Sequence, residues 1–245
     1  MQPLAVLIQF LLVIRPTTAS IDDLLPFGPG IDTHFLNYSS DSQEKPFFSF
    51  QATDAFGVDY DILIDIIGFL DLTIGGRLYT VYMFSINRYH KCAMSARVVH
   101  DMETKKRIYD IIGDEYCNAS ISFVATWNQC RFGCADADDT SNTFQTAVVA
   151  TTTALYAVYI YAEIGHNCGS EFGHFDNDEF YTIKQIENGS TGLAEITTHS
   201  NIGRNGIYVV KYDYNQATEP GLLPNSGTFC GTIKSDTTET EDGKL

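Results

Sequence analysis

The sequence has few basic residues. Its 245 residues include 15 Lys and Arg against 31 Asp and Glu, so the formal net charge is −16. An acidic chain repels phosphate groups, which argues against a nucleic acid as partner and against binding to an anionic membrane surface. Hydrophobic residues still make up 44% of the chain. That share can build a real core, so the composition predicts a folded domain of ordinary size.

The sequence also lacks the short motifs of familiar catalytic sites. It contains no G-x-S-x-G, and its glycine-containing stretch GFLDLTIGGR (68–77) lacks the G-K-[ST] ending of a phosphate-binding loop. We therefore expect a protein that is not an enzyme and that uses no cofactor. The alternative is a secreted hydrolase in which folding brings histidine and aspartate side chains together.

Metal motifs are incomplete. The stretch CRFGC (130–134) is C-x-x-x-C, and no second such pair accompanies it as a zinc site would require. Two acidic stretches contain Asp136, Asp138 and Asp139, and Asp176, Asp178 and Glu179. Neither has the glycine and the distant glutamate of an EF-hand loop, so we expect solvated loops and no metal site. A calcium-dependent lectin-like binding domain remains the alternative.

Long apolar runs are missing too. The run LAVLIQFLLVI (4–14) is too short to span a bilayer, and the small residues Thr17 and Ala19 follow it. This order predicts a signal peptide over residues 1–19, cut after Ala19, although no basic residue precedes the run. A buried N-terminal helix is the alternative. No later run is predicted to span a membrane, and residues 215–245 are predicted to form a flexible acidic tail. The expected product is secreted and extracellular.

Cysteines and glycosylation motifs agree with export. The chain has six cysteines and three N-x-[ST] sequons, at Asn37, Asn118 and Asn188. An even number of cysteines behind a signal peptide predicts disulfides. We expect a local Cys130–Cys134 bond and a Cys92–Cys117 bond that brackets a helix. Cys168 would then pair with Cys230, or Cys230 would link to another chain. The cysteines are Cys92, Cys117, Cys130, Cys134, Cys168 and Cys230.

Periodicity predicts an α+β fold that is mainly antiparallel β and sandwich-like. The pattern of 94–112 has roughly helical spacing with charges between apolar residues, and predicts one substantial helix that stops at Gly113. Residues 143–150 and 154–161 predict two strands joined by a threonine turn, the second buried on both faces. Strands are also expected at 46–51, 77–86, 120–127 and 206–213, whereas 21–45 is expected to be extended chain and loops. Residues 60–72 fit strands or a short buried helix.

Six ordered motifs resemble the nidogen-type (NIDO) extracellular domains found in nidogen, alpha-tectorin and membrane mucins. They are LLPFGPGIDT (24–33), IGGRLYTVY (74–82), ARVVHDMETKKRIYD (96–110), FVATWNQC (123–130), SNTFQTAVVATTTALYAVYIYAEIG (141–165) and SNIGRNGIYVVKYD (200–213). Together they cover about residues 25–213. The resemblance implies one NIDO-like domain over 20–214, with a shortened N-terminal part because the family's N-N-G strand has no counterpart in 47–71. It implies a non-catalytic module of cell–matrix adhesion that binds extracellular matrix or cell-surface proteins.

Overall fold

The computed structural model describes residues 20–39, 45–54, 56–66, 68–83, 89–113, 116, 119–132, 141–165, 170–176, 179–186 and 196–213. Twelve strands form two six-stranded sheets, and every strand pairing is antiparallel. Sheet A has the order β1 (His34–Ser39), β6 (Tyr89–Val98), β7 (Ala119–Phe132), β8 (Asn142–Thr151), β9 (Ala154–Ile164) and β12 (Ile207–Asp213). Sheet B has the order β11 (Glu179–Ile186), β10 (Ser170–Asp176), β5 (Arg77–Tyr82), β4 (Phe69–Ile74), β3 (Asp59–Asp65) and β2 (Phe47–Thr53).

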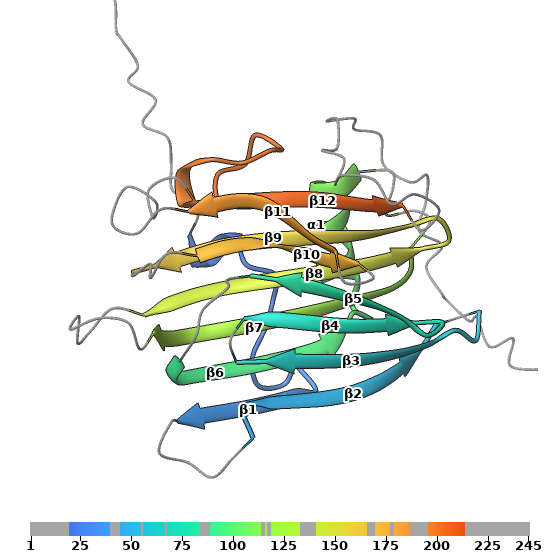
Figure 1. Cartoon of the computed structure of the whole chain (residues 1–245), viewed down its shortest axis with the longest axis horizontal. Helices are drawn as coiled ribbons and strands as arrows, with labels where there is room; N and C mark the ends of the chain where they lie inside the picture. The colour runs from blue at the N-terminus through green and yellow to red at the C-terminus, as the bar shows by residue number, and fades with distance from the viewer. Residues whose placement is uncertain are drawn as a thin grey trace, which may run out of the picture.

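The two sheets pack face to face around the main core, as Figure 1 shows. Inward side chains such as Ile62 of sheet B and Phe123 of sheet A fill this core. Polar contacts also join the sheets: among them, the Trp127 indole donates a hydrogen bond to the Asp65 carbonyl at 2.9 Å, and the Tyr161 hydroxyl donates one to the Met83 carbonyl at 2.8 Å. The predicted sandwich, mainly antiparallel and with one substantial helix, is confirmed.

The β8–β9 hairpin was the clearest sequence prediction, and it is confirmed. A turn at Thr152 and Thr153 joins two strands whose side chains are almost all buried. One face of β9, including Tyr159 and Tyr161, lies in the core between the sheets. The other face, including Tyr156, packs in a second cluster on the outer side of sheet A. Strand β9 lies inside the sheet, as two buried faces require.

The outer side of sheet A is covered by a third layer. Helix α1 (Met102–Ile112) and the N-terminal segment, with the 3₁₀ turn η1 (Ile21–Asp23), pack Ile108, Ile112, Leu24 and Leu25 against it. Figure 1 shows α1 on the side of sheet A that faces away from sheet B. The central strands β8 and β9 of sheet A are therefore buried on both faces, which explains the apolar residues on both sides of β9.

The helix begins later than its periodicity predicted. Residues 94–98 belong to strand β6, where Met94 and Ala96 face the main core. The carboxylate of Asp101 accepts the backbone N–H of Thr104 at 2.7 Å and caps the helix, and Gly113 with φ 69° ends it. Val98 and Val99 fit the helical spacing although they precede the N-cap Asp101, so the spacing alone predicted a helix that begins too early. The prediction of a helix over 94–112 was therefore wrong for 94–101.

Extended chain and loops were expected over 21–45, and residues 34–39 of this stretch pair with β6 as strand β1, which the turn residues around it did not indicate. The open alternative at 60–72 is resolved: β3 and β4 form a hairpin. Strand pairing also corrects the disulfides. Strands β6 and β7 are neighbours whose register places Ala93 opposite Asn128, and the bond found is Cys92–Cys130. The expected Cys92–Cys117 and Cys130–Cys134 pairings were therefore wrong. Cys117, Cys134, Cys168 and Cys230 lie outside the described residues.

Candidate functional site

The outward side of sheet B differs from that of sheet A. Alternation along β2–β5 sends every second side chain away from the core, and the strand register fixes which of these are neighbours. No described residue covers β2–β4 as α1 covers sheet A. We call this surface the open face. Its members are Phe47, Ser49, Gln51, Thr53, Asp59, Asp61, Leu63, Asp65, Phe69, Asp71, Thr73, Leu78 and Thr80.

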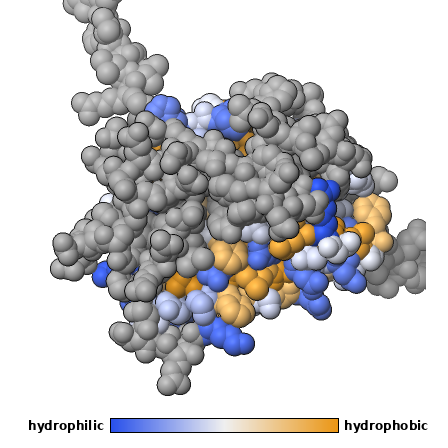
Figure 2. Space-filling model, viewed as in Figure 1, coloured by the Kyte–Doolittle hydropathy of each residue, from blue (hydrophilic) through white to orange (hydrophobic). Residues whose placement is uncertain are grey.

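An open groove of about 450 Å³ crosses this face. Its walls alternate carboxylates and amides with apolar side chains, and Figure 2 shows this mixture of hydrophilic and hydrophobic atoms in the lower part of the view, where Figure 1 places β2–β4. A mixed, uncovered groove offers both apolar contact and hydrogen-bond partners, as binding surfaces do. It is lined by Ser49, Phe50, Gln51, Asp61, Ile62, Leu63, Asp71, Thr73 and Leu78.

The polar groups of the groove are held by cross-strand hydrogen bonds. The Gln51 amide donates to a carboxylate oxygen of Asp61 at 2.7 Å, and the Thr80 hydroxyl donates to Asp71. Burial raises the pKa of the Asp71 carboxyl above its ordinary value of 3.8, and the hydrogen bond from Thr80 offsets part of that rise. The two carboxylates therefore point at fixed positions, and one of them is partly removed from water.

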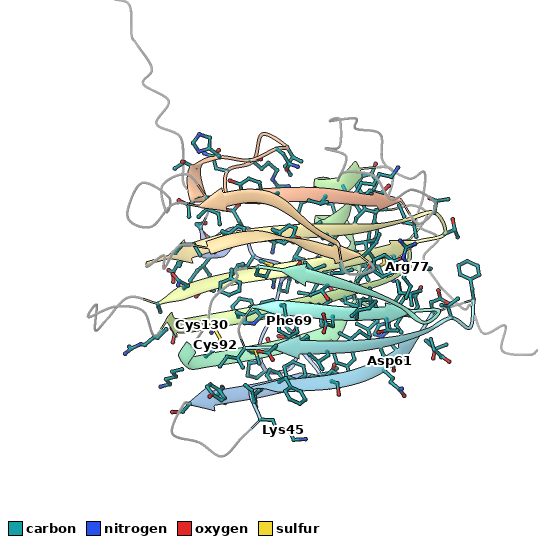
Figure 3. The ribbon with its side chains drawn as sticks, in the orientation of Figure 1. Lys45, Asp61, Phe69, Arg77, Cys92 and Cys130 are labelled. Atoms are coloured by element: carbon teal, nitrogen blue, oxygen red, sulfur yellow. A yellow bond between two sulfur atoms is a disulfide. The ribbon has the colours of Figure 1, made fainter. Side chains whose placement is uncertain are left out.

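The charge of the open face has one sign. Its outward positions include four aspartates, and none of the described side chains among them is Lys or Arg. Lys45 lies at its margin, 5.6 Å from the ring centre of Phe47, and Figure 3 labels Lys45 together with Asp61 and Phe69. The surface is therefore acidic, with apolar side chains between the carboxylates.

The β2–β3 turn projects an aromatic side chain at one end of this face. The carboxylate of Asp54 accepts the backbone N–H groups of Phe56 and Val58 at 2.8 and 3.0 Å, and the Tyr60 hydroxyl at 3.0 Å. Burial works to raise the pKa of Asp54, but these hydrogen bonds outweigh it and lower the pKa. These bonds tie the backbone of Phe56 and Val58 to Asp54, while the Phe56 side chain is 72% exposed. An exposed aromatic ring suits a protein contact.

The family-like motifs at the chain start serve the covered side of sheet A. Arg97 is 2% exposed; its guanidinium lies 2.9 Å from the Asp32 carboxylate and donates to the Pro26 carbonyl at 2.7 Å and to the Thr104 hydroxyl at 2.8 Å. The Gln145 amide accepts the Leu25 N–H at 2.8 Å and donates to the Leu25 carbonyl at 3.1 Å. These motifs join the N-terminal segment, β6, β8 and α1, so their role is structural.

The predicted site residues are scattered. Asn37 is exposed on the edge strand β1, whereas Asn118 and Asn188 lie outside the described residues, as do Asp136, Asp138, Asp139 and Asp178. Asp176 and Glu179 lie in β10 and β11, but their side chains are not described. Within the described part of the chain, no three His, Cys, Asp or Glu side chains are arranged to hold a metal ion.

Histidines do not gather with aspartates where they are described. The ring of His34 stacks on Phe50 with ring centres 4.1 Å apart, and burial lowers its pKa. His100 is exposed, and His199 contacts the Thr198 hydroxyl at 3.3 Å. The hydroxyl of Ser120, which contacts Tyr60, donates to the Ala150 carbonyl at 3.1 Å. Among the described side chains no histidine contacts this hydroxyl, so this serine is not arranged there as an activated nucleophile.

Comparison with protein families gives one result: the model of the nidogen-like domain matches residues 42–213. The chain belongs to the nidogen-like domain family. Domains of this family are generally non-catalytic, are typically extracellular and bind extracellular proteins. The comparisons with curated proteins and with solved structures each found no match. None of the helices in the described residues is long and apolar enough to cross a membrane.

The open face was not foreseen from the sequence, because the stretch that forms β3 and β4 was interpreted only as apolar, either as strands or as a short buried helix. A signal was present: Asp59, Asp61 and Asp65 alternate with apolar residues, and Asp71 and Thr73 do the same in β4. Such alternation is typical of a strand with one side in water. Which polar side chains become neighbours depends on the register of strands β2–β5. The residues within any one strand do not determine this register.

Proposed function

We propose that this chain is a secreted, non-catalytic adhesion module that binds matrix or cell-surface proteins through its open face. The observation that carries the proposal is the contrast between the two outer faces: one is covered by α1 and the N-terminal segment, and the other carries an open groove that no described residue covers. A surface with apolar and polar groups in alternation is typical of a protein interaction site.

Several features support export. The disulfide Cys92–Cys130 fits an oxidising compartment, and the sequon asparagine Asn37 is accessible on β1. The backbone N–H of Ser20 donates to the Asp23 carboxylate at 2.8 Å. A cut after Ala19 would turn this amide into an ammonium group, which the same carboxylate would hold more strongly.

A glycan placed in the groove tests the role of the open face. The substitution Gln51→Asn completes a sequon with Thr53, so a secreting eukaryotic cell attaches a sugar chain at the centre of the groove. The matched control is Met102→Asn, which completes a sequon with Thr104 at the start of α1; Met102 is 50% exposed. Both glycans are verified by a mass shift that an N-glycosidase reverses.

The readout is capture of proteins from a matrix extract by the immobilised, secreted glycoproteins, quantified by mass spectrometry. We expect the wild type and Met102→Asn to enrich the same proteins, and Gln51→Asn to lose them. Adding Thr53→Val to Gln51→Asn removes the sequon and should restore capture. Equal capture by the two glycan variants would refute the open face as the binding site.

Export itself is tested by the mass and the N-terminal sequence of the protein recovered from the medium. We expect Ser20 as its first residue and a loss of mass on removal of N-glycans. Retention of the protein inside the cell with Met1 in place would contradict the proposal.

A further inference from the structure

We propose that the partner segment that binds the open face is an extended, lysine- or arginine-rich stretch of an extracellular protein, with cationic side chains at alternate positions. This inference rests on the proposed function, since it names the chemistry of the partner at the same site. The feature that leads to it is that two carboxylates, Asp61 and Asp71, line one groove. The apolar side chains of Leu63 and Leu78 line the same groove.

Charge complementarity selects the sign of the partner. The open face has four outward aspartates, Asp59, Asp61, Asp65 and Asp71, and no Lys or Arg among its described side chains. Nucleic acids, sulfated sugars and anionic lipids are repelled by such a surface. A cation that pairs with Asp71 also offsets the free-energy cost of keeping this carboxylate charged while it is partly removed from water, the same desolvation that raises its pKa.

The spacing of the carboxylates selects an extended chain. The register places Asp61 of β3 opposite Thr73 of β4. Asp71 lies two residues before Thr73 on the same strand, so Asp61 and Asp71 are diagonal neighbours on one face of the sheet. Diagonal positions of an antiparallel pair lie about 7–8 Å apart. In an extended peptide, side chains two residues apart point the same way and are about 6.6–6.8 Å apart. Cations at alternate positions therefore match both carboxylates at once.

Apolar contacts complete the fit. Leu78 is 49% exposed beside the groove, and Leu63 lies directly opposite Asp71 on the neighbouring strand. The methylene stems of Lys and Arg pack on such side chains while their charged ends reach the carboxylates. Phe56, whose backbone N–H is bound by Asp54 after the end of β2, offers a further apolar contact where the segment leaves the groove. An acidic segment would place like charges against Asp61 and Asp71.

The probes are short fluorescent peptides: one alternates lysine with valine, and the other has glutamate in place of each lysine. Binding to the secreted glycoprotein is measured by fluorescence anisotropy at several salt concentrations. We expect the lysine peptide to bind with an affinity that falls as salt rises, and the glutamate peptide not to bind.

Two charge variants show whether the binding is local. The open-face pair is Asp61→Asn with Asp71→Ser; serine is chosen because Asp71→Asn would complete a sequon with Thr73. The matched pair is Asp110→Asn with Glu103→Ser, two exposed carboxylates of α1. Each pair removes two negative charges. We expect about a tenfold loss of affinity for the open-face pair and less than about a twofold loss for the α1 pair.

Equal losses for the two pairs, or equal binding of the two peptides, would overturn the inference, because attraction to net charge alone gives that result. The proposed function has a separate readout. If the groove glycan abolishes capture from matrix but the Asp61–Asp71 pair captures as the wild type does, the open face binds a partner of other chemistry and only this inference fails. Unfolding midpoints that match the wild type exclude misfolding as the cause of any loss.

Discussion

The outer faces of the two sheets carry out different tasks with the same strand geometry. On sheet A, the outward residues Arg97 and Gln145 are buried under α1 and the N-terminal segment and bind them by hydrogen bonds. On sheet B, the outward residue Gln51 donates a hydrogen bond to Asp61 on the neighbouring strand, and both side chains are in contact with solvent. A buried polar contact contributes strongly to folding, whereas an exposed one contributes little and remains available to a ligand.

This difference explains why most of the family-like motifs do not mark the candidate site. The stretches around Asp32, Arg97 and Gln145 hold the covered face together, so their side chains already have partners within the fold. Of the six motifs, IGGRLYTVY (74–82) alone contributes to the lining of the groove, with Leu78. The other lining residues belong to β2, β3 and β4 and lie outside the motifs.

The largest test of the comparison is Arg97→Met on the covered face. It leaves Asp32 buried beside an apolar side chain, and we expect a loss of about 3–5 kcal/mol in the free energy of unfolding, measured in urea. The matched control is Arg107→Met, which removes an exposed hydrogen bond to the Asp22 carbonyl and should cost less than about 0.5 kcal/mol. Similar losses for the two variants would remove the distinction between covered and exposed contacts.

The disulfide should rank second. Replacing Cys92 and Cys130 together by alanine opens a covalent loop with a sequence separation of 38 residues, and we expect a loss of about 2–4 kcal/mol. The measurement is again urea unfolding of the purified protein. Peptide mapping without reduction serves as the check on connectivity, and a Cys92–Cys117 peptide in that map would contradict the pairing of β6 with β7 described above.

One substitution made on both faces sharpens the comparison further. Gln145→Ala on the covered face leaves the buried backbone groups of Leu25 without their partner and should cost about 1–3 kcal/mol. Gln51→Ala on the open face removes one exposed hydrogen bond to Asp61 and should change stability by less than about 0.5 kcal/mol. If Gln51→Ala lost as much stability as Gln145→Ala, the polar contacts of the open face would be needed for folding, and they would not be free for a binding partner.

The smallest effect is expected at the edge where the two sheets meet. His34 of β1 stacks on Phe50 of β2, and burial lowers its pKa from the ordinary value of 6.5. The unfolded chain therefore takes up this proton more readily than the folded one, so stability falls as pH drops through 6.5. We expect His34→Phe to lose less stability than the wild type between pH 7.5 and pH 5, measured as shifts in unfolding midpoint.

The control for that profile is His100→Phe, because His100 is exposed. We expect its midpoint to follow the wild type across the same pH range. If His34→Phe retained the full acid sensitivity of the wild type, the edge contact would not be its source.

Local pattern predicted the parts of the fold that are set locally. Both faces of β9 could be read from its apolar residues, and the stop of α1 from Gly113. The start of α1 could not, since Val98 and Val99 satisfy a helical period while β7 and β1 hold their strand in a sheet. The Cys92–Cys130 bond and the groove depend on the register between neighbouring strands. This register could not be predicted from the local pattern of a single sequence.

The N-terminal segment has a practical consequence for expressing this protein. The family match begins at residue 42, yet Leu24, Leu25 and Asp32 are buried against sheet A, and β1 forms its edge. A gene fragment trimmed to the matched region would lose that edge strand and leave Arg97 without the buried Asp32 carboxylate. A recombinant product should therefore start no later than Ser20, because here the boundary of a recognisable pattern falls inside the folding unit.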